Sequence, residues 1–218
     1  MNTKQDNKIL KSNLSDEGVL RLTLNDPTNQ NTLSEQMMKN IQLSLEESAK
    51  NNKVRVIIIS AVGSVFSAGH DLKALKKGRQ GPDRGRSYFQ KVLKQCSKMM
   101  LTIVKNPKPI IAEVGGVATA AGCQLVASCD LAYASKSAKF ATPGVNIGLF
   151  CSTPMVALSR NISKKHSMEM LLHGELISSN KAADIGLVNE VINDDQLEKY
   201  TLEKALKITK KSSNTIKI

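Results

Sequence analysis

The stretch VGGVATAAGCQL, residues 114–125, passes from an apolar run into a short helix through small residues. KPIIAEVGG (108–116) predicts a buried strand before it, and AAGCQLVASC (120–129) predicts the helix. A second stretch, VFSAGHDLK (65–73), also leads from a strand into a helix that starts at Asp71. Because a helix N-terminus leaves backbone N–H groups free, the amides of His70 and Ala121 could converge on one oxygen atom as an oxyanion hole.

Strands and helices interleave on both sides of these turns. Leu20, Leu22 and Leu24 alternate as in a strand, and VRVIIIS (54–60) predicts a strand buried on both faces. TLSE (32–35) resembles a capping box that opens a helix to about Lys50, and a long helix is expected from about Arg84 to Val104. AVGSVFSAGHD (61–71) is interpreted as a loop.

Further along, the pattern repeats. It predicts strands at DLAYAS (130–135), AKFATPG (138–144) and LVNEVI (187–192), helices at STPMVALSR (152–160), SMEMLLHG (167–174) and SSNKAADIG (178–186), and a last amphipathic helix from Asp194 to Lys211. Two strands often precede a helix. The pattern therefore predicts an α/β fold whose successive units stack as turns of a spiral.

Composition sets further bounds. The 218 residues fit one core domain, residues 1–210, followed by a polar tail, 211–218. No apolar run approaches the roughly 20 residues of a membrane span, and the N-terminus shows no targeting peptide. The four cysteines lack C-x-x-C spacing and the three histidines lack H-x-x-x-H spacing, so reduced thiols are expected rather than a metal site. Fingerprints of nucleotide-binding loops and of the G-x-S-x-G nucleophile are absent.

Charge is concentrated in one window. The formal net charge is +12, and residues 73–108 hold eleven Lys or Arg and one acid, Asp83, which gives +10 there. Such a window favours a polyanion as partner, namely cofactor phosphates, RNA or a membrane surface, although a solvated face would have the same composition. Two groups stand out: Lys73, Lys76 and Lys77 behind the first turn, and a stripe of Lys91, Lys94, Lys98 and Lys105 on the long helix.

Four motifs, in this order and spacing, carry a family resemblance. FSAGHDLK, GGVATAAGCQLVASCDLAYAS, KFATPGVNIGL and ADIGLVNEVI resemble the crotonase (enoyl-CoA hydratase/isomerase) superfamily over about residues 8–210. The resemblance implies a spiral of ββα units, trimeric assembly, and a coenzyme A thioester as ligand without a permanently bound cofactor or metal. It implies that the amides of His70 and Ala121 hold the thioester oxygen. Ala68, Gly69 and Gly122 would then lie against the ligand, and Lys73, Lys76 and Lys77 against the CoA phosphates.

The catalytic positions depart from that pattern. The two glutamates of the hydratases fall on Gln124 and Gly144, and no Asp or Glu occurs between Asp130 and Glu169. Gln124 can orient a water molecule but cannot accept a proton. Since a general acid or base contributes roughly 10²–10⁴ to a rate, we expect a site that polarises a thioester but hydrates it weakly or not at all. Isomerases keep an acid at the Gly144 position, so double-bond migration is in doubt too.

Several alternatives stay open. The His70 ring could serve as a base, although packing or solvent exposure is favoured, and Cys123 could be a nucleophile although it has no basic neighbour. Asp71 is expected to cap a helix and Asp130 to brace a strand start. RNA binding through the lysine stripe, or a structural subunit of mixed trimers, would replace the acyl-CoA hypothesis. The resemblance also predicts C-terminal trimerisation helices, which we expect to be truncated in this chain. It further predicts a mitochondrial matrix location in a eukaryote and otherwise a cytoplasmic one.

Overall fold

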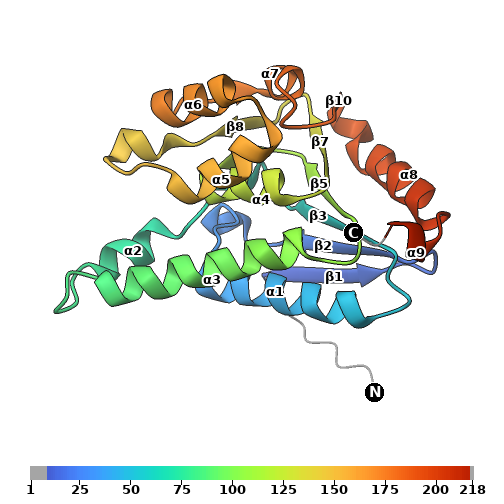
Figure 1. Cartoon of the computed structure of the whole chain (residues 1–218), viewed down its shortest axis with the longest axis horizontal. Helices are drawn as coiled ribbons and strands as arrows, with labels where there is room; N and C mark the ends of the chain where they lie inside the picture. Colours follow the sequence, from blue (N-terminus) through green and yellow to red (C-terminus); the bar gives the residue numbers. More distant parts are fainter. Residues whose placement is uncertain (1–8, 217–218) are drawn as a thin grey trace.

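Two sheets form the centre of the computed structural model, which describes residues 9–216 (Figure 1). The larger sheet has the order β1-β2-β3-β5-β7-β10, and the smaller one the order β4-β6-β8-β9. Pairs β1–β2 and β8–β9 are antiparallel, and the other neighbours are parallel. The strands are β1 (Leu10–Leu14), β2 (Val19–Leu24), β3 (Val56–Ala61), β4 (Val65–Ser67), β5 (Ile110–Val114), β6 (Val117–Thr119), β7 (Leu131–Ser135), β8 (Lys139–Ala141), β9 (Ile177–Ser178) and β10 (Glu190–Ile192).

Helices follow the strands in turn. They are α1 (Glu35–Lys50), α2 (Leu72–Gly78), α3 (Arg86–Val104), α4 (Ala121–Ser128), α5 (Ser152–Asn161), α6 (Lys164–His173), α7 (Ser179–Asp184), α8 (Leu197–Thr209) and α9 (Ser213–Ile216), with 3₁₀ turns at Pro27–Asn29, Pro143–Ile147 and Asp194–Gln196. Within residues 9–216 no helix combines the length and apolarity that crossing a membrane requires.

Successive units wind as a spiral. Strands β3, β5 and β7 each enter the larger sheet, and the strand after each of them, β4, β6 or β8, enters the smaller sheet before the chain turns into helices. The predicted α/β spiral is therefore confirmed. Its consequence for function is that β4, β6 and β8 run parallel side by side, so that their carboxyl ends meet at one edge.

Strand β3 shows why the larger sheet is buried on both faces. Ile57 and Ile59 belong to the main apolar core, whereas Val56 and Ile58 face a second cluster. Leu197 and Ala205 of α8 complete that second cluster, and α8 lies along the outer side of the sheet in Figure 1. The β-branched run predicted as a doubly buried strand is confirmed.

Some boundaries differ from the sequence predictions. Helix α1 begins at Glu35 with Ser34 as its cap, not Thr32, because the Leu33 amide is bonded to Gly69 and holds the preceding residues extended. The predicted loop 61–71 contains β4, and β1, β6 and β9 were not predicted; these strands are short, and their pairing with distant residues stabilises them. In α3, Leu93 lies outside the buried stripe and is 44% exposed.

The two ends of the chain can be compared with the predicted domain boundary at residue 210 and with the predicted polar tail. Helix α8 ends just before the predicted domain boundary at residue 210, and α9 forms inside the predicted polar tail. The Arg55 guanidinium donates a 2.5 Å hydrogen bond to the Lys211 carbonyl, which ties the start of that tail to the larger sheet. The prediction about a targeting peptide falls partly on residues 1–8, which lie outside the described residues.

Candidate functional site

The turns that follow β4 and β6 lie against each other. A Cβ atom added to Gly69 would stand 3.0 Å from the Ala121 nitrogen and 3.0 Å from the Thr119 carbonyl oxygen. The Thr119 hydroxyl also donates a 3.2 Å hydrogen bond to the Ala68 carbonyl. Parallel pairing of β4 with β6 thus brings the predicted residues Ala68, Gly69 and Ala121 to the same edge.

Gly122 permits this close approach. A Cβ atom there would lie 2.2 Å from the Ser67 carbonyl oxygen, well inside van der Waals contact. A side chain would therefore push the first turn of α4 away from the end of β4. The close contact requires glycine at this position, whereas its backbone conformation does not, because its φ is not positive.

Two backbone amides are left free at the junction. The His70 and Ala121 N–H groups donate to no acceptor anywhere in the described part of the chain. Ala121 is the first residue of α4, where an N–H lacks an intrahelical partner and the helix dipole favours negative charge. Two amides without a protein acceptor therefore lie on the two turns that meet at Gly69 and Ala121.

Ala120 holds the second turn in a strained conformation. Its φ of 49° and ψ of −119° lie in a region that suits glycine, and such strain costs about 1–3 kcal/mol. Its N–H donates a 2.9 Å hydrogen bond to the Ala141 carbonyl at the end of β8. The strained residue thus links the second turn to the third parallel strand, and strain of this kind is typical of functional sites.

Residues before α1 fix the first turn, and the sequence analysis did not identify them. The Asn31 side chain is fully buried and donates to the carbonyls of Val62 and Val65, at 2.9 and 2.7 Å. The Ala68 N–H donates to the Gln30 carbonyl, at 3.1 Å. Both Gln30 and Asn31 have positive φ, a conformation that asparagine tolerates. The available signal is the Asn-rich stretch NDPTNQN (25–31), whose contacts with the first turn local patterns do not reveal.

The two positions expected for catalytic acids lie on adjoining segments. Gln124 is 6% exposed on α4, and its side-chain oxygen has no hydrogen-bond partner among residues 9–216. Gly144 lies in the turn after β8, where an added Cβ would meet the Leu149 carbonyl oxygen at 2.4 Å and the Cys151 sulfur at 2.7 Å. The second position therefore lacks both an acid and the space for one.

Thiol chemistry is not favoured at this site. All four cysteines, Cys96, Cys123, Cys129 and Cys151, are free and buried. Burial raises the pKa of Cys123 to about 12, with a smaller contribution from nearby Cys151. A thiol that stays protonated at neutral pH is a poor nucleophile.

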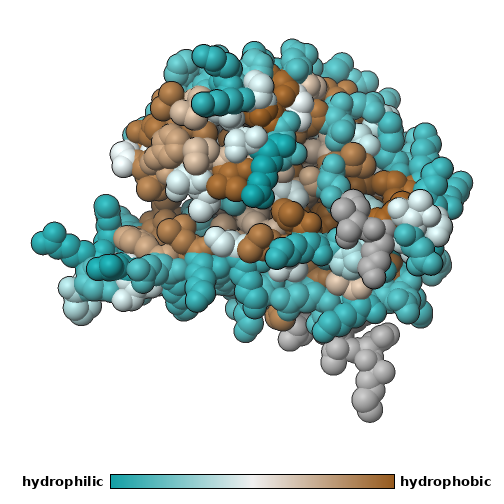
Figure 2. All heavy atoms as spheres, in the orientation of Figure 1, coloured by the Kyte–Doolittle hydropathy of each residue, from teal (hydrophilic) through white to brown (hydrophobic). Residues whose placement is uncertain are grey.

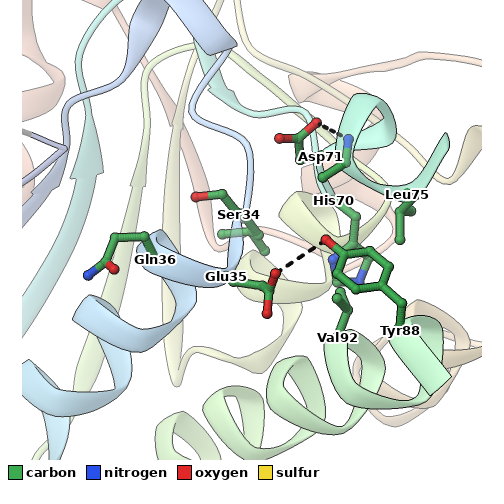
Figure 3. A pocket seen from close by; sticks show the side chains of 10 residues that line it. Ser34, Glu35, Gln36, His70, Asp71, Leu75, Tyr88 and Val92 are labelled. Atoms are coloured by element: carbon green, nitrogen blue, oxygen red, sulfur yellow. Dashed lines mark hydrogen bonds between the residues drawn. The ribbon is translucent and has the colours of Figure 1, made fainter. Parts of the chain in front are cut away.

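The side chain of His70 points into a cavity of about 250 Å³ (Figure 3). The cavity lies between the start of α1, helix α2 and the start of α3. Both ring nitrogens are buried, and within residues 9–216 neither makes a hydrogen bond of normal geometry. Burial lowers the pKa of the imidazole, and a weaker interaction with the Leu33 backbone carbonyl offsets part of that effect. Gln124 is absent from this cavity, so the His70 ring and the Gln124 amide line different spaces.

Helix α2 presents the first group of lysines. Lys73, Lys76 and Lys77 are exposed, and none forms an ion pair within residues 9–216. Asp71 caps this helix as predicted, because its carboxylate accepts from the amides of Lys73 and Ala74. Asp130 likewise braces β5 as predicted, since it accepts from the Ile110 N–H at 2.7 Å.

The predicted lysine stripe is on the exposed side of α3. Lys94, Lys98 and Lys105 are exposed, but Lys91 pairs with Glu35 at 2.7 Å. The stripe therefore offers three unpaired charges instead of the four expected. This pairing could not be predicted, because Glu35 is 56 positions earlier in the chain.

A wider cleft of about 560 Å³ lies between α3, α4 and α5. Gln124 and Asp130 line it together with Leu101, Val104 and Val156, which are 49%, 52% and 46% exposed. Figure 2 shows apolar residues gathered in this part of the molecule, above the hydrophilic surface along α3 and α1. In residues 9–216 there is no group of three or more His, Cys, Asp or Glu side chains that could hold a metal ion.

Comparisons with known proteins agree with this architecture. The family model described as enoyl-CoA hydratase/isomerase matches residues 15–218. The chain is 46% identical over 207 residues to mouse enoyl-CoA hydratase domain-containing protein 3, mitochondrial, covering 95% of this chain and 67% of that protein. The crystal structure of human enoyl-CoA hydratase domain-containing protein 3 superposes with a TM-score of 0.89 at 45% identity, over 96% of this chain and 80% of that one. The crystal structure of an enoyl-CoA hydratase from Mycobacterium smegmatis superposes with a TM-score of 0.91 at 43% identity, over 96% of this chain and 79% of that one.

Proposed function

Because this chain belongs to the enoyl-CoA hydratase/isomerase family, we propose that it binds acyl-CoA or enoyl-CoA thioesters and has weak or no hydratase activity. The observation that carries the proposal is the asymmetry of the edge where β4, β6 and β8 end. Two free amides lie together after β4 and β6, whereas the turn after β8 is closed around Gly144. The chain spans about two thirds of the length of its curated relatives, so oligomeric state and full activity also belong to the proposal.

The binding step uses the free amides. In this proposal the His70 and Ala121 N–H groups donate to the thioester carbonyl oxygen, with the α4 dipole adding to the attraction. A preorganised pair of donors stabilises the negative charge that develops on that oxygen in an enolate-like state, and removing one donor typically costs roughly 10²–10³ in rate. Thioester binding and carbonyl polarisation therefore need no side chain at this point.

The chemical step lacks a proton carrier. Gln124 occupies one acid position with an amide that can hydrogen-bond a water molecule but cannot take its proton. Gly144 occupies the other, and the Leu149 carbonyl and the Cys151 sulfur fill the space that a side chain would need. Without a general base on one side and an acid on the other, polarisation alone does not add water to a double bond.

The remaining assignments follow the family. Lys73, Lys76 and Lys77, exposed directly behind the first turn, would contact the CoA phosphates. We further propose a role in fatty-acid metabolism, assembly as a trimer, and a mitochondrial location, the last because curated relatives carry that word in their names. A CoA thioester is the only ligand that these features require.

Two measurements on the unmutated protein test the proposal. Isothermal titration with crotonyl-CoA should show saturable binding, and loss of the enoyl thioester absorbance should be far slower than an ordinary turnover of about 10 s⁻¹. Turnover near that value would show that another group, such as the His70 ring, moves the proton. Absence of binding would reject the acyl-CoA assignment itself.

A further inference from the structure

The turn between α2 and α3 carries a group of arginines that the proposed function does not use. We call residues 79–86 the basic tip; its cations are Arg79, Arg84 and Arg86, and all three are exposed. None of them forms an ion pair within residues 9–216. Figure 1 shows that α2 and the start of α3 project beyond the body of the molecule, and Figure 2 shows hydrophilic residues at this projecting end.

The backbone of the basic tip is closely packed and hydrogen-bonded. The Arg86 N–H donates to the Asp83 carbonyl at 3.2 Å. A Cβ atom on Gly85 would lie 3.0 Å from the Gly78 carbonyl oxygen, so the two ends of the turn are in close contact. Arg84 has a φ of 54°, a left-handed conformation that is uncommon for residues other than glycine. The turn therefore fixes the backbone positions of the three arginines relative to one another.

The only acid of the basic tip, Asp83, is engaged elsewhere. Its carboxylate accepts hydrogen bonds from the N–H groups of Gly85 and Ser87, at 3.0 and 2.8 Å, and from the Ser87 hydroxyl. These bonds hold the carboxylate at the start of α3, where the helix dipole favours negative charge. The three arginines consequently present unpaired positive charges at the projecting end of the molecule.

Unpaired cations on a projecting turn are suited to an extended anionic surface. A small anion is bound best where several donors surround it, whereas a projecting group can contact many negative charges spread over a surface. The phosphates of an anionic membrane leaflet and the backbone of a nucleic acid both present charge in that way. A further feature of the same region favours the membrane.

That feature is an exposed leucine at the start of α2. Leu72 is 57% exposed, and Arg79 keeps helical backbone angles at the end of α2, so Leu72, Lys76 and Arg79 lie on one face at i, i+4 and i+7. Basic residues beside an exposed apolar side chain are typical of segments that lie on a membrane surface, where the apolar group enters the headgroup region. The phosphates of RNA give a leucine no apolar surroundings.

We propose that the basic tip, together with Leu72, is a docking site for an anionic lipid surface. The arginines are attracted by the headgroup phosphates, and Leu72 adds an apolar contact at the boundary with the acyl chains. The inference does not depend on the proposed function, because neither Leu72 nor the three arginines are among the residues proposed to contact the thioester. Lys76 is proposed to contact the CoA phosphates, so the tests leave it unchanged.

Sedimentation with lipid vesicles tests the docking site. The protein should bind vesicles of phosphatidylcholine that contain about 30% phosphatidylserine, and it should not bind vesicles of phosphatidylcholine alone. Salt at about 1 M should release it, because the Debye length falls from about 8 Å at physiological salt to about 3 Å. Equal binding to the two kinds of vesicle, or no binding to the anionic ones, would overturn the inference.

A triple variant assigns the binding to the basic tip. It combines Arg79→Gln, Arg86→Gln and Arg84→Asn, since asparagine tolerates a positive φ. Affinity for the anionic vesicles should fall about a hundredfold, because each cation near such a surface contributes a factor of about five. The matched control removes the same charge from exposed lysines of α6 and α7, by Lys164→Gln, Lys165→Gln and Lys181→Gln. Unchanged binding is expected for the control, and equal losses in the two variants would refute a specific tip.

Leu72 distinguishes a lipid surface from RNA. Leu72→Ser should lower the affinity for anionic vesicles about three- to tenfold, whereas Leu172→Ser, at a leucine of α6 that is 58% exposed, should not change it. If Leu72→Ser has no effect and an RNA oligonucleotide binds through the three arginines, the tip is an RNA-binding surface and the inference is wrong.

The docking site and the proposed function can fail separately. The arginine triple variant should keep the urea midpoint of the unmutated protein and its affinity for crotonyl-CoA, because all three side chains are exposed and lie outside the proposed thioester site. Vesicle binding without crotonyl-CoA binding would reject only the proposed function. Crotonyl-CoA binding without vesicle binding would reject only the docking site.

Discussion

The turns after β4 and β6 differ in one respect from the turn after β8, although all three follow parallel strands of one sheet. At the first two, small residues keep the backbone close and leave the His70 and Ala121 amides free. At the third, the chain folds back on itself, and the Leu149 carbonyl and Cys151 sulfur occupy the space beside Gly144. The same edge therefore keeps the two amides that we propose as donors to a thioester oxygen, and it has no acid at Gly144.

In the proposed function, this difference separates ligand binding from proton transfer. Backbone amides depend on the path of the chain, so they survive substitutions that preserve small residues. A general base depends on one side chain and on the space around it, so it is lost when the side chain is replaced or when the space beside it is filled. Changes at the first two turns should therefore affect ligand binding, and changes at the third turn should not.

The largest effect is expected at the contact between the first two turns. Gly122→Val would place a side chain 2.2 Å from the Ser67 carbonyl oxygen and separate the turns. We expect a loss of about 3 kcal/mol in the free energy of unfolding, by overpacking, together with the loss of crotonyl-CoA binding. Urea titration and calorimetry measure the two effects.

Gly115→Ala is the control, because an added Cβ there meets only the Leu197 side chain at 3.8 Å. It should leave stability and binding close to those of the unmutated protein. Crotonyl-CoA binding by Gly122→Val with unchanged affinity would show that the contact of the turns is not needed for the site.

A substitution in the third turn should lower the stability of the protein and leave ligand binding unchanged. Gly144→Ala brings a methyl group against the Leu149 carbonyl and the Cys151 sulfur, and we expect a loss of about 2 kcal/mol in unfolding free energy. Folded protein should bind crotonyl-CoA as before. Gly144→Glu should be less stable still and should not gain hydratase activity, even combined with Gln124→Glu.

Denaturation curves and a titration at a temperature where Gly144→Ala stays folded would check this. A marked drop in affinity would place Gly144 in the ligand site and remove the distinction between the turns.

A smaller effect is expected from the lysines behind the first turn. Replacement of Lys73, Lys76 and Lys77 by Ala should lower the affinity for acyl-CoA by about tenfold, since each exposed charge contributes a fraction of a kcal/mol to the binding free energy. The matching pantetheine thioester, which lacks the nucleotide phosphates, should bind almost unchanged.

Lys94, Lys98 and Lys105 on α3 provide a control with the same loss of charge. Their replacement by Ala should leave the affinities for acyl-CoA and for the pantetheine thioester unchanged at physiological salt. Equal losses for acyl-CoA and the pantetheine thioester in the first variant would contradict the phosphate assignment, and RNA binding that only the second variant loses would favour the alternative function.

The smallest effect concerns backbone strain. Ala120→Gly replaces alanine at φ 49° and ψ −119° with a residue that adopts this conformation easily, and we expect a gain of about 1 kcal/mol in unfolding free energy. Ala68→Gly, in the first turn but without positive φ, should instead lose about 0.5–1 kcal/mol. A loss in both variants would show that Ala120 is not strained, and urea titration distinguishes the outcomes.

Sequence patterns predicted the parts of this protein that depend on local order. The run at 54–60 gave a doubly buried strand, Asp71 a helix cap and Asp130 a strand brace, because alternation and capping act over a few residues. The residues of both turns stand out in contiguous motifs. The resemblance of those motifs to the crotonase superfamily implies that the acid positions fall on Gln124 and Gly144, and the roles of these residues stay predictions.

Tertiary structure alone decided what depends on distant neighbours. Strand β4 exists because it pairs with β6, and the first turn is fixed by Asn31, more than thirty positions earlier. Contacts between distant segments likewise pair Lys91 with Glu35, fill the space around Gly144 and bury the His70 ring. Local sequence patterns do not reveal these contacts. The sequence thus determined which residues form the two turns, because local patterns act over a few positions, whereas packing between distant segments determined which spaces beside those turns are open and which are closed.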